Sequence, residues 1–167
     1  SDVYKRQPQR LLSQPDEVYG ALLLLREHLI GVRGTLDSYI FVDFEYDMTT
    51  TGIDVMQLAA GPLVLLFDTL SFADPLVFPC LLDPSAPKDS SRAVPSLRFW
   101  LESPEVCVVL QAGGNDATKL RQGYGVTIVR PFDTCIADGV LNGSPLTGRG
   151  LGRLTSAYLA HSDMAVK

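Results

Sequence analysis

The sequence predicts an α/β domain in which helices flank a mixed sheet of five strands. Three apolar runs, at 39–45, 53–60 and 63–68, follow one another with short polar links, and such links favour antiparallel neighbours. Two further runs, at 106–110 and 126–129, alternate with segments of helical periodicity, which favours strands covered by helices. At 167 residues, 46% of them hydrophobic, the chain can bury the core of one ordinary domain.

A helix is predicted at 16–32, before the first strand. Pro15 and Asp16 suit a helix start, and Gly31 and Gly34 suit a helix end. The apolar side chains that recur at helical intervals along it are Val18, Leu22, Leu25 and Leu29. Further helices are predicted at 96–101, 117–124, 133–141 and 150–159.

Two segments depart from simple alternation. The run at 63–67 is apolar on both faces, which predicts a strand covered on both sides by other elements. The stretch 82–95 is rich in proline and carries no periodic pattern, so it is predicted to be a surface loop.

The ends of the chain do not have the character of the middle. Residues 1–7 lack an initiator Met and resemble the translation of a sequencing adapter, and Lys167 follows a helix without a stop signal. We therefore expect a non-native or disordered arm at 1–15 and a domain at 16–167 that is incomplete at its C-terminus.

Composition limits the class of protein. No apolar stretch approaches the roughly 20 residues that span a bilayer, so no membrane association is expected. Three widely spaced cysteines, Cys80, Cys107 and Cys135, with only His28 and His161, form no zinc pattern and predict reduced thiols in an intracellular protein of the cytoplasm or nucleus. The net charge of −5 argues against broad, nonspecific nucleic-acid affinity but does not exclude a nuclease.

The first strand carries the most informative pair of residues. Asp43 and Glu45 lie two apart inside an apolar run, so both carboxylates emerge on one face while Val42 and Phe44 point to the other. Adjacent carboxylates repel and are stabilised by cations, and oxygen ligands favour Mg²⁺ or Mn²⁺. The alternative is an edge strand with a solvated face.

A third carboxylate, Asp116, lies where the fourth strand gives way to a helix. Loops at strand ends are where α/β sheets gather functional groups. Taken alone, an aspartate in this place is more often a helix N-cap.

Six short motifs follow one another along the chain over about 39–159. They are Asp43-x-Glu45, Gln57 in the second strand, Phe67-Asp68 closing the third, Asn115-Asp116-x-x-x-Leu120, Pro131-Phe132-Asp133-Thr134-x-x-Ala137, and Gly150-Leu151-x-x-Leu154-x-x-x-Tyr158-Leu159. No single motif is specific, but in this order and spacing they resemble the ribonuclease D branch of the DEDD superfamily of 3′-5′ exonucleases.

The resemblance implies a ribonuclease H-like fold and hydrolysis of phosphodiesters from a single-stranded 3′ end to 5′-mononucleotides. It implies two Mg²⁺ or Mn²⁺ ions, with Asp43, Glu45 and Asp116 as catalytic ligands, Asp43 as the bridge and Asp116 acting through water. Nucleic acid is the expected partner, with RNA favoured over DNA, although no residue is identifiable that would read a 2′-hydroxyl.

The chain departs from this family at its end. The family requires a fourth aspartate preceded four residues earlier by a tyrosine or histidine. Tyr158 and Asp163 come closest, but they are five apart and would not share a helix face, and His161 lies too near the end to be credited. We expect the missing pair to lie beyond Lys167 and this chain to be weakly active or inactive.

Two other functions stay open. One is a catalytically silent domain of the same fold that binds RNA or a protein, and the other is an endonuclease. Retention of all three acids counts against the first, and the Asn115-Asp116 and Phe132-Asp133-Thr134 motifs count against the second.

Other conspicuous residues receive structural interpretations. Asp47 suits a solvated turn. Asp133 and Asp138 are assigned to structure, with Asp133 capping a helix. Phe99 and Trp100 are expected in the core. The basic residues that are equally compatible with phosphate contacts and with solvated helix faces are Lys119, Arg121, Arg149 and Arg153.

Overall fold

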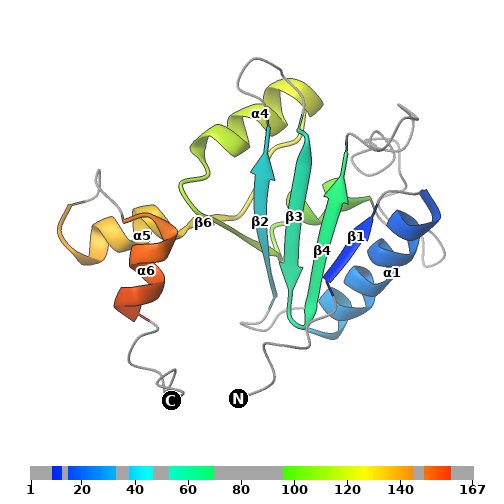
Figure 1. Ribbon diagram of the computed structural model, residues 1–167, viewed down its shortest axis with the longest axis horizontal. Helices are drawn as coiled ribbons and strands as arrows, with labels where there is room; N and C mark the ends of the chain where they lie inside the picture. The colour runs from blue at the N-terminus through cyan, green and yellow to red at the C-terminus, as the bar shows by residue number, and fades with distance from the viewer. Residues whose placement is uncertain are drawn as a thin grey trace.

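The computed structural model describes residues 9–12, 15–32, 38–46, 53–69, 96–144 and 149–158. The predicted loop at 82–95, the arm at 1–8, and Asp47, Cys80, His161 and Asp163 lie outside these ranges. The elements, in chain order, are β1 (Gln9–Leu12), α1 (Pro15–Gly31), β2 (Tyr39–Glu45), β3 (Val55–Ala60), β4 (Leu63–Asp68), α3 (Leu97–Leu101), β5 (Cys107–Leu110), α4 (Gly114–Tyr124), β6 (Pro131–Asp133), α5 (Thr134–Leu141) and α6 (Leu151–Tyr158) (Figure 1).

The strands form one mixed sheet in the order β1-β4-β3-β2-β5-β6. The short links place β2, β3 and β4 antiparallel, as predicted, whereas β2 pairs parallel with β5 and β5 with β6. Figure 1 shows α1 beside the β1 and β4 edge, and α5 and α6 beyond β6 at the opposite edge. The predicted α/β sheet flanked by helices is therefore confirmed, but it has six strands rather than five.

The additional strand comes from the segment assigned to the N-terminal arm. Gln9–Leu12 pair parallel with β4, and Leu12 is 1% exposed. Of its two leucines, Leu12 is buried and Leu11 is exposed. The strand also pairs with the backbone N–H and C=O groups at the edge of β4, which would otherwise lack partners in the sheet.

The last strand lies later than predicted. Residues 126–129 do not form a strand. Gly125 ends α4 in a left-handed conformation, and Val126, which follows it, is buried in the core. The apolar residues of this segment therefore reflect core packing and not strand pairing. Pro131–Asp133 forms β6 instead. Proline is tolerated there because β6 is an edge strand, where no partner needs its missing N–H.

One face of the sheet carries the core. The alternate β2 residues Ile40, Val42 and Phe44 are 0–5% exposed and join a single apolar cluster with the inner faces of α1, α3 and α4. Trp100 is buried in it and Phe99 packs against it, which confirms the predicted core role of this pair. None of the helices in the described part of the chain is long and apolar enough to cross a membrane.

The other face of the sheet, called the open face below, is only partly covered by the described residues. Phe41 is 47% exposed, and its neighbours across the sheet are Ala59 on β3 and Val109 on β5. Val64 and Leu66 of β4 are only half-buried, so the prediction that this strand is covered on both sides is wrong for the described residues. Packing in the core holds one face of the sheet in place, whereas Asp43 on the other face is accessible to solvent.

A buried carboxylate joins α5 to α6. Asp138 is 3% exposed and accepts hydrogen bonds from the Arg149 backbone N–H at 3.0 Å, from Arg149 Nε at 3.0 Å and from the Tyr158 hydroxyl at 3.0 Å. The Arg149 guanidinium holds the pKa of the Asp138 carboxyl well below its usual range. The structural role predicted for Asp138 is confirmed, and Arg149 is its ion-pair partner.

Acid should weaken this contact. Because the folded pKa of Asp138 lies below the unfolded value of about 4, its stabilising contribution is complete above that value and is lost as the pH falls below it. Urea unfolding at about pH 6 and about pH 3 should show a larger loss of stability in the parent than in Asp138→Asn. Equal losses in the two proteins would contradict this role.

Candidate active site

The strand β2 presents two carboxylates to the open face of the sheet. Asp43 and Glu45 are both exposed, whereas Phe44 between them is 5% exposed and belongs to the core. Because Val42 and Phe44 are buried on one face of β2, the alternating side chains of Asp43 and Glu45 must point to the other face. The predicted alternation is confirmed.

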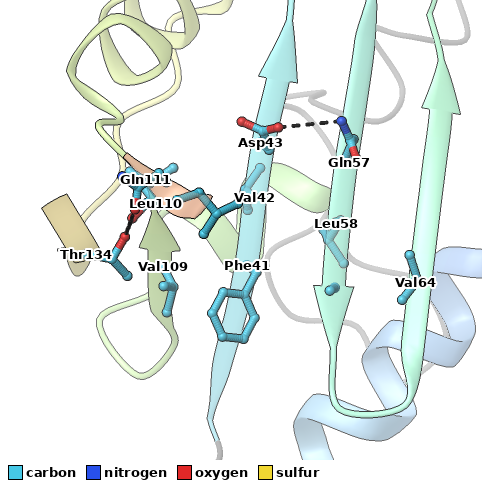
Figure 2. Close-up of a pocket in the computed structure, with 12 residues that line it drawn as sticks. Phe41, Val42, Asp43, Gln57, Leu58, Val64, Val109, Leu110, Gln111 and Thr134 are labelled. Atoms are coloured by element: carbon cyan, nitrogen blue, oxygen red, sulfur yellow. Dashed lines mark hydrogen bonds between the residues drawn. The ribbon is translucent and has the colours of Figure 1, made fainter. Parts of the chain in front are cut away.

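A glutamine lies across the sheet from the first of these acids. Gln57 is the β3 partner of Asp43, and its amide Nε2 donates to Asp43 Oδ2 at 3.5 Å, as Figure 2 shows. The amide supplies a neutral donor to a carboxylate that has a like-charged neighbour, and it restricts the orientation of that carboxylate.

Asp116 is not an N-cap. The N-cap of α4 is Gly113, and Asp116 is the third residue inside the helix, in its first turn. Its side chain is 8% exposed, unusual burial for a carboxylate on a helix whose other buried side chain is Leu120. The simplest structural role for this residue is therefore excluded.

The structure brings Asp116 within electrostatic reach of the β2 pair. Burial, and next the charge of Asp43, raise the pKa of Asp116 to about 6, and the charges of Glu45 and Asp133 add to the rise. A hydrogen bond from the Tyr46 hydroxyl opposes it. Figure 1 shows α4 passing the end of β2 at which these acids lie. The ionised form of Asp116 is thus disfavoured by its burial and by the charges of the β2 pair.

This arrangement is a cluster of charge rather than a finished chelate. Within the described ranges, no group of three or more His, Cys, Asp or Glu side chains is disposed so that it could hold a metal ion. The donors nonetheless fit Mg²⁺ or Mn²⁺ chemically, because they are carboxylate oxygens whose mutual repulsion a cation would relieve.

Sequence reasoning missed Tyr46. Its hydroxyl bonds to Asp116, its pKa is raised by burial and by the Asp116 charge, and the Lys119 ammonium lies 4.2 Å from its ring centroid. The sequence signal that could have identified Tyr46 is its position directly after Glu45. Lys119 therefore lies beside the candidate site, whereas Arg121 and Arg153 are exposed.

A hollow of about 520 Å³ opens beside Asp43 on the open face. Phe41, Ala59 and Val109 form part of its apolar wall, and Gln57 and Asp43 stand at its polar end (Figure 2). An apolar pocket with a few converging polar groups is typical of a small-molecule or nucleotide site.

The chain matches no protein-family model and no curated protein. It is similar in structure to solved nucleases. Ribonuclease D of Trypanosoma brucei in complex with GMP superposes with a TM-score of 0.67 at 20% identity, over 94% of this chain and 43% of that chain. The chain has the ribonuclease D-like exonuclease fold.

Two further structures agree. The catalytic core of RRP6 from Trypanosoma brucei gives a TM-score of 0.64 at 17% identity, over 92% of this chain and 35% of that chain. The EXD2 exonuclease domain soaked in Mn and Mg gives 0.57 at 20% identity, over 92% and 69%. The chain thus spans 35% of the RRP6 chain and 43% of the ribonuclease D chain. The ribonuclease D-like fold matches the resemblance that the sequence motifs indicated.

The raised pKa of Asp116 makes a prediction about the metal-free protein. Because its folded pKa of about 6 lies above the unfolded value, the ionised residue destabilises the fold near pH 8, and stability returns as the pH falls through 6. Asp116→Asn should therefore be more stable than the parent near pH 8 by about 1–2 kcal/mol, with the difference shrinking toward pH 4. Thermal unfolding in EDTA measures this. A variant less stable than the parent at pH 8 would contradict the proposed charge cluster.

Proposed function

We propose that this chain is a metal-dependent 3′-5′ exonuclease domain that hydrolyses nucleic-acid phosphodiesters from the 3′ end to 5′-mononucleotides by a two-metal mechanism. The observation that carries the proposal is the approach of Asp116, from the first turn of α4, to the Asp43 and Glu45 pair of β2. A fold needs no such mutual repulsion for stability, so the cluster suggests a site whose ligand is cationic.

Asp43, Glu45 and Asp116 would hold the ions through their carboxylate oxygens. When bound, the ions supply an attacking water of lowered pKa and stabilise charge on the leaving 3′ oxygen. Gln57 donates to the Asp43 carboxylate, and the Tyr46 hydroxyl donates to the Asp116 carboxylate.

A single-stranded 3′ end of nucleic acid, RNA in preference to DNA, is the proposed substrate. Ribonuclease D of Trypanosoma brucei has been solved with RNA and with GMP, and EXD2 has been soaked with Mn and Mg. The hollow beside Asp43 has an aromatic wall at Phe41, and aromatic faces accept any base by stacking. We also propose an intracellular location, consistent with free thiols at Cys107 and Cys135.

A silent scaffold is the second candidate, and one observation favours it: the described residues contain no preformed metal cluster. In addition, Tyr158 is engaged by Asp138 and Arg149, so it does not act at the acids. A water-orienting residue and a fourth acid would have to come from outside the described residues.

Divalent metal should stabilise the parent protein and support cleavage. We expect millimolar Mn²⁺ to raise the melting temperature of the parent by about 2–5 °C, since a ligand that binds only the folded state adds to stability. Asp43→Ala should lose this shift. Glu27→Gln, which removes an exposed carboxylate on α1, should keep it.

Product analysis identifies the reaction. A 5′-labelled RNA strand incubated with Mn²⁺ should shorten stepwise from its 3′ end, slowly, with release of 5′-mononucleotides. Internal fragments would indicate an endonuclease. No cleavage together with no melting shift would favour the scaffold.

A further inference from the structure

The loop between β5 and α4 adopts a conformation that its own residues disfavour. Ala112 has φ of 53°, the one positive φ at a non-glycine residue among those described. An alanine is strained in this left-handed region, because its Cβ crowds the following carbonyl oxygen. The next residue must be glycine, because a Cβ on Gly113 would lie 2.6 Å from Leu110 Cβ. Something outside the loop must stabilise it.

The Asp133 carboxylate supplies that stabilisation. Its Oδ1 accepts the Ala112 N–H at 3.1 Å and its Oδ2 accepts the Gly113 N–H at 2.8 Å. Successive backbone N–H groups that converge on an anion are characteristic of a left-handed turn of this kind. The same carboxylate also caps α5, accepting the N–H groups of Cys135 at 2.8 Å and Ile136 at 3.3 Å. The predicted capping role is confirmed, and it is only half of what Asp133 contacts.

The loop of Ala112 and Gly113, which Asp133 clamps, immediately precedes the helix turn that carries Asp116, a candidate metal ligand. Gly113 is the N-cap of α4, and its carbonyl accepts the Ala117 N–H at 2.9 Å, which closes the turn that contains Asp116. Asp116 is the third residue of α4 and is buried, so the start of the helix fixes where its carboxylate lies. Two hydrogen-bonded steps link Asp133 to this turn, the first from the Gly113 N–H to Asp133 and the second from the Ala117 N–H to the Gly113 carbonyl.

We propose that Asp133 is a positioning residue for the metal site, which holds the strained Ala112-Gly113 turn so that the first turn of α4 keeps Asp116 facing Asp43 and Glu45. This inference rests on the proposed function for its consequence, the affinity for metal. Its structural half, control of the α4 start, is independent of that function.

Asp133→Asn separates the two roles of the residue. Asparagine is as good an N-cap as aspartate, so α5 keeps its cap and the chain should fold. The amide nitrogen that replaces one oxygen cannot accept a hydrogen bond, so one of the two loop N–H groups loses its acceptor. The matched control is Asp138→Asn, the same change on the same helix, whose partners Arg149 and Tyr158 lie outside the loop.

A rescue variant tests the mechanism. Glycine adopts a positive φ without strain, so Ala112→Gly removes the cost that the Asp133 contact offsets. Mn²⁺ titration by calorimetry should show about tenfold weaker binding in Asp133→Asn, recovered to within about threefold of the parent in Asp133→Asn with Ala112→Gly. Asp138→Asn should lose stability without a change in Mn²⁺ affinity.

Hydrogen exchange supplies a readout that needs no metal. The Ala117 amide should exchange about tenfold faster in Asp133→Asn than in the parent, and Ala112→Gly should slow it again. Unchanged exchange and unchanged Mn²⁺ affinity in Asp133→Asn would overturn the proposal, as would a loss of affinity that Ala112→Gly does not recover. If the parent binds no Mn²⁺, the proposed function fails, and exchange at Ala117 alone decides whether Asp133 positions α4.

Discussion

Repulsion among carboxylates is the constraint that organises this molecule. Asp43 and Glu45 share one face of β2, and Asp116 is buried where their charges raise its pKa. Burial beside these charges disfavours the ionised form of Asp116, so interactions made elsewhere must hold this residue in place. Phe44 and the rest of the core fix the strand pair, and the clamped loop before α4 fixes Asp116.

The two faces of the sheet divide this work. The buried face gives β2 a rigid position, because its alternate residues pack in one cluster with α1, α3 and α4. The open face keeps Asp43 accessible beside a hollow of about 520 Å³. A rigid support under an accessible acidic cluster is what positioned metal chemistry requires. The ribonuclease D-like fold of the chain is compatible with that chemistry. In the proposed exonuclease, bound cations would offset the repulsion among the three carboxylates.

The sequence predicted those features that depend on residues close together in the chain. The bounds of β2 and β4 follow from alternation and short links, and Asp43 and Glu45 share a face for that reason. The strand at Gln9–Leu12 was missed because its stability comes from the edge of β4, more than fifty residues away. Contacts of Asp133 with Ala112 and Gly113, about twenty residues apart, leave no sequence signal beyond an apparent helix cap. Tyr46 was missed because its partner lies on α4.

The most direct test is a crystal structure of the protein soaked in Mn²⁺, read by anomalous scattering. The account predicts two manganese peaks at the end of β2, with oxygens of Asp43 and Glu45 at about 2.0–2.3 Å and Asp116 reaching one ion through water. Ordered acids with no manganese density among them, or manganese bound while Asp116 points away from Asp43, would contradict it.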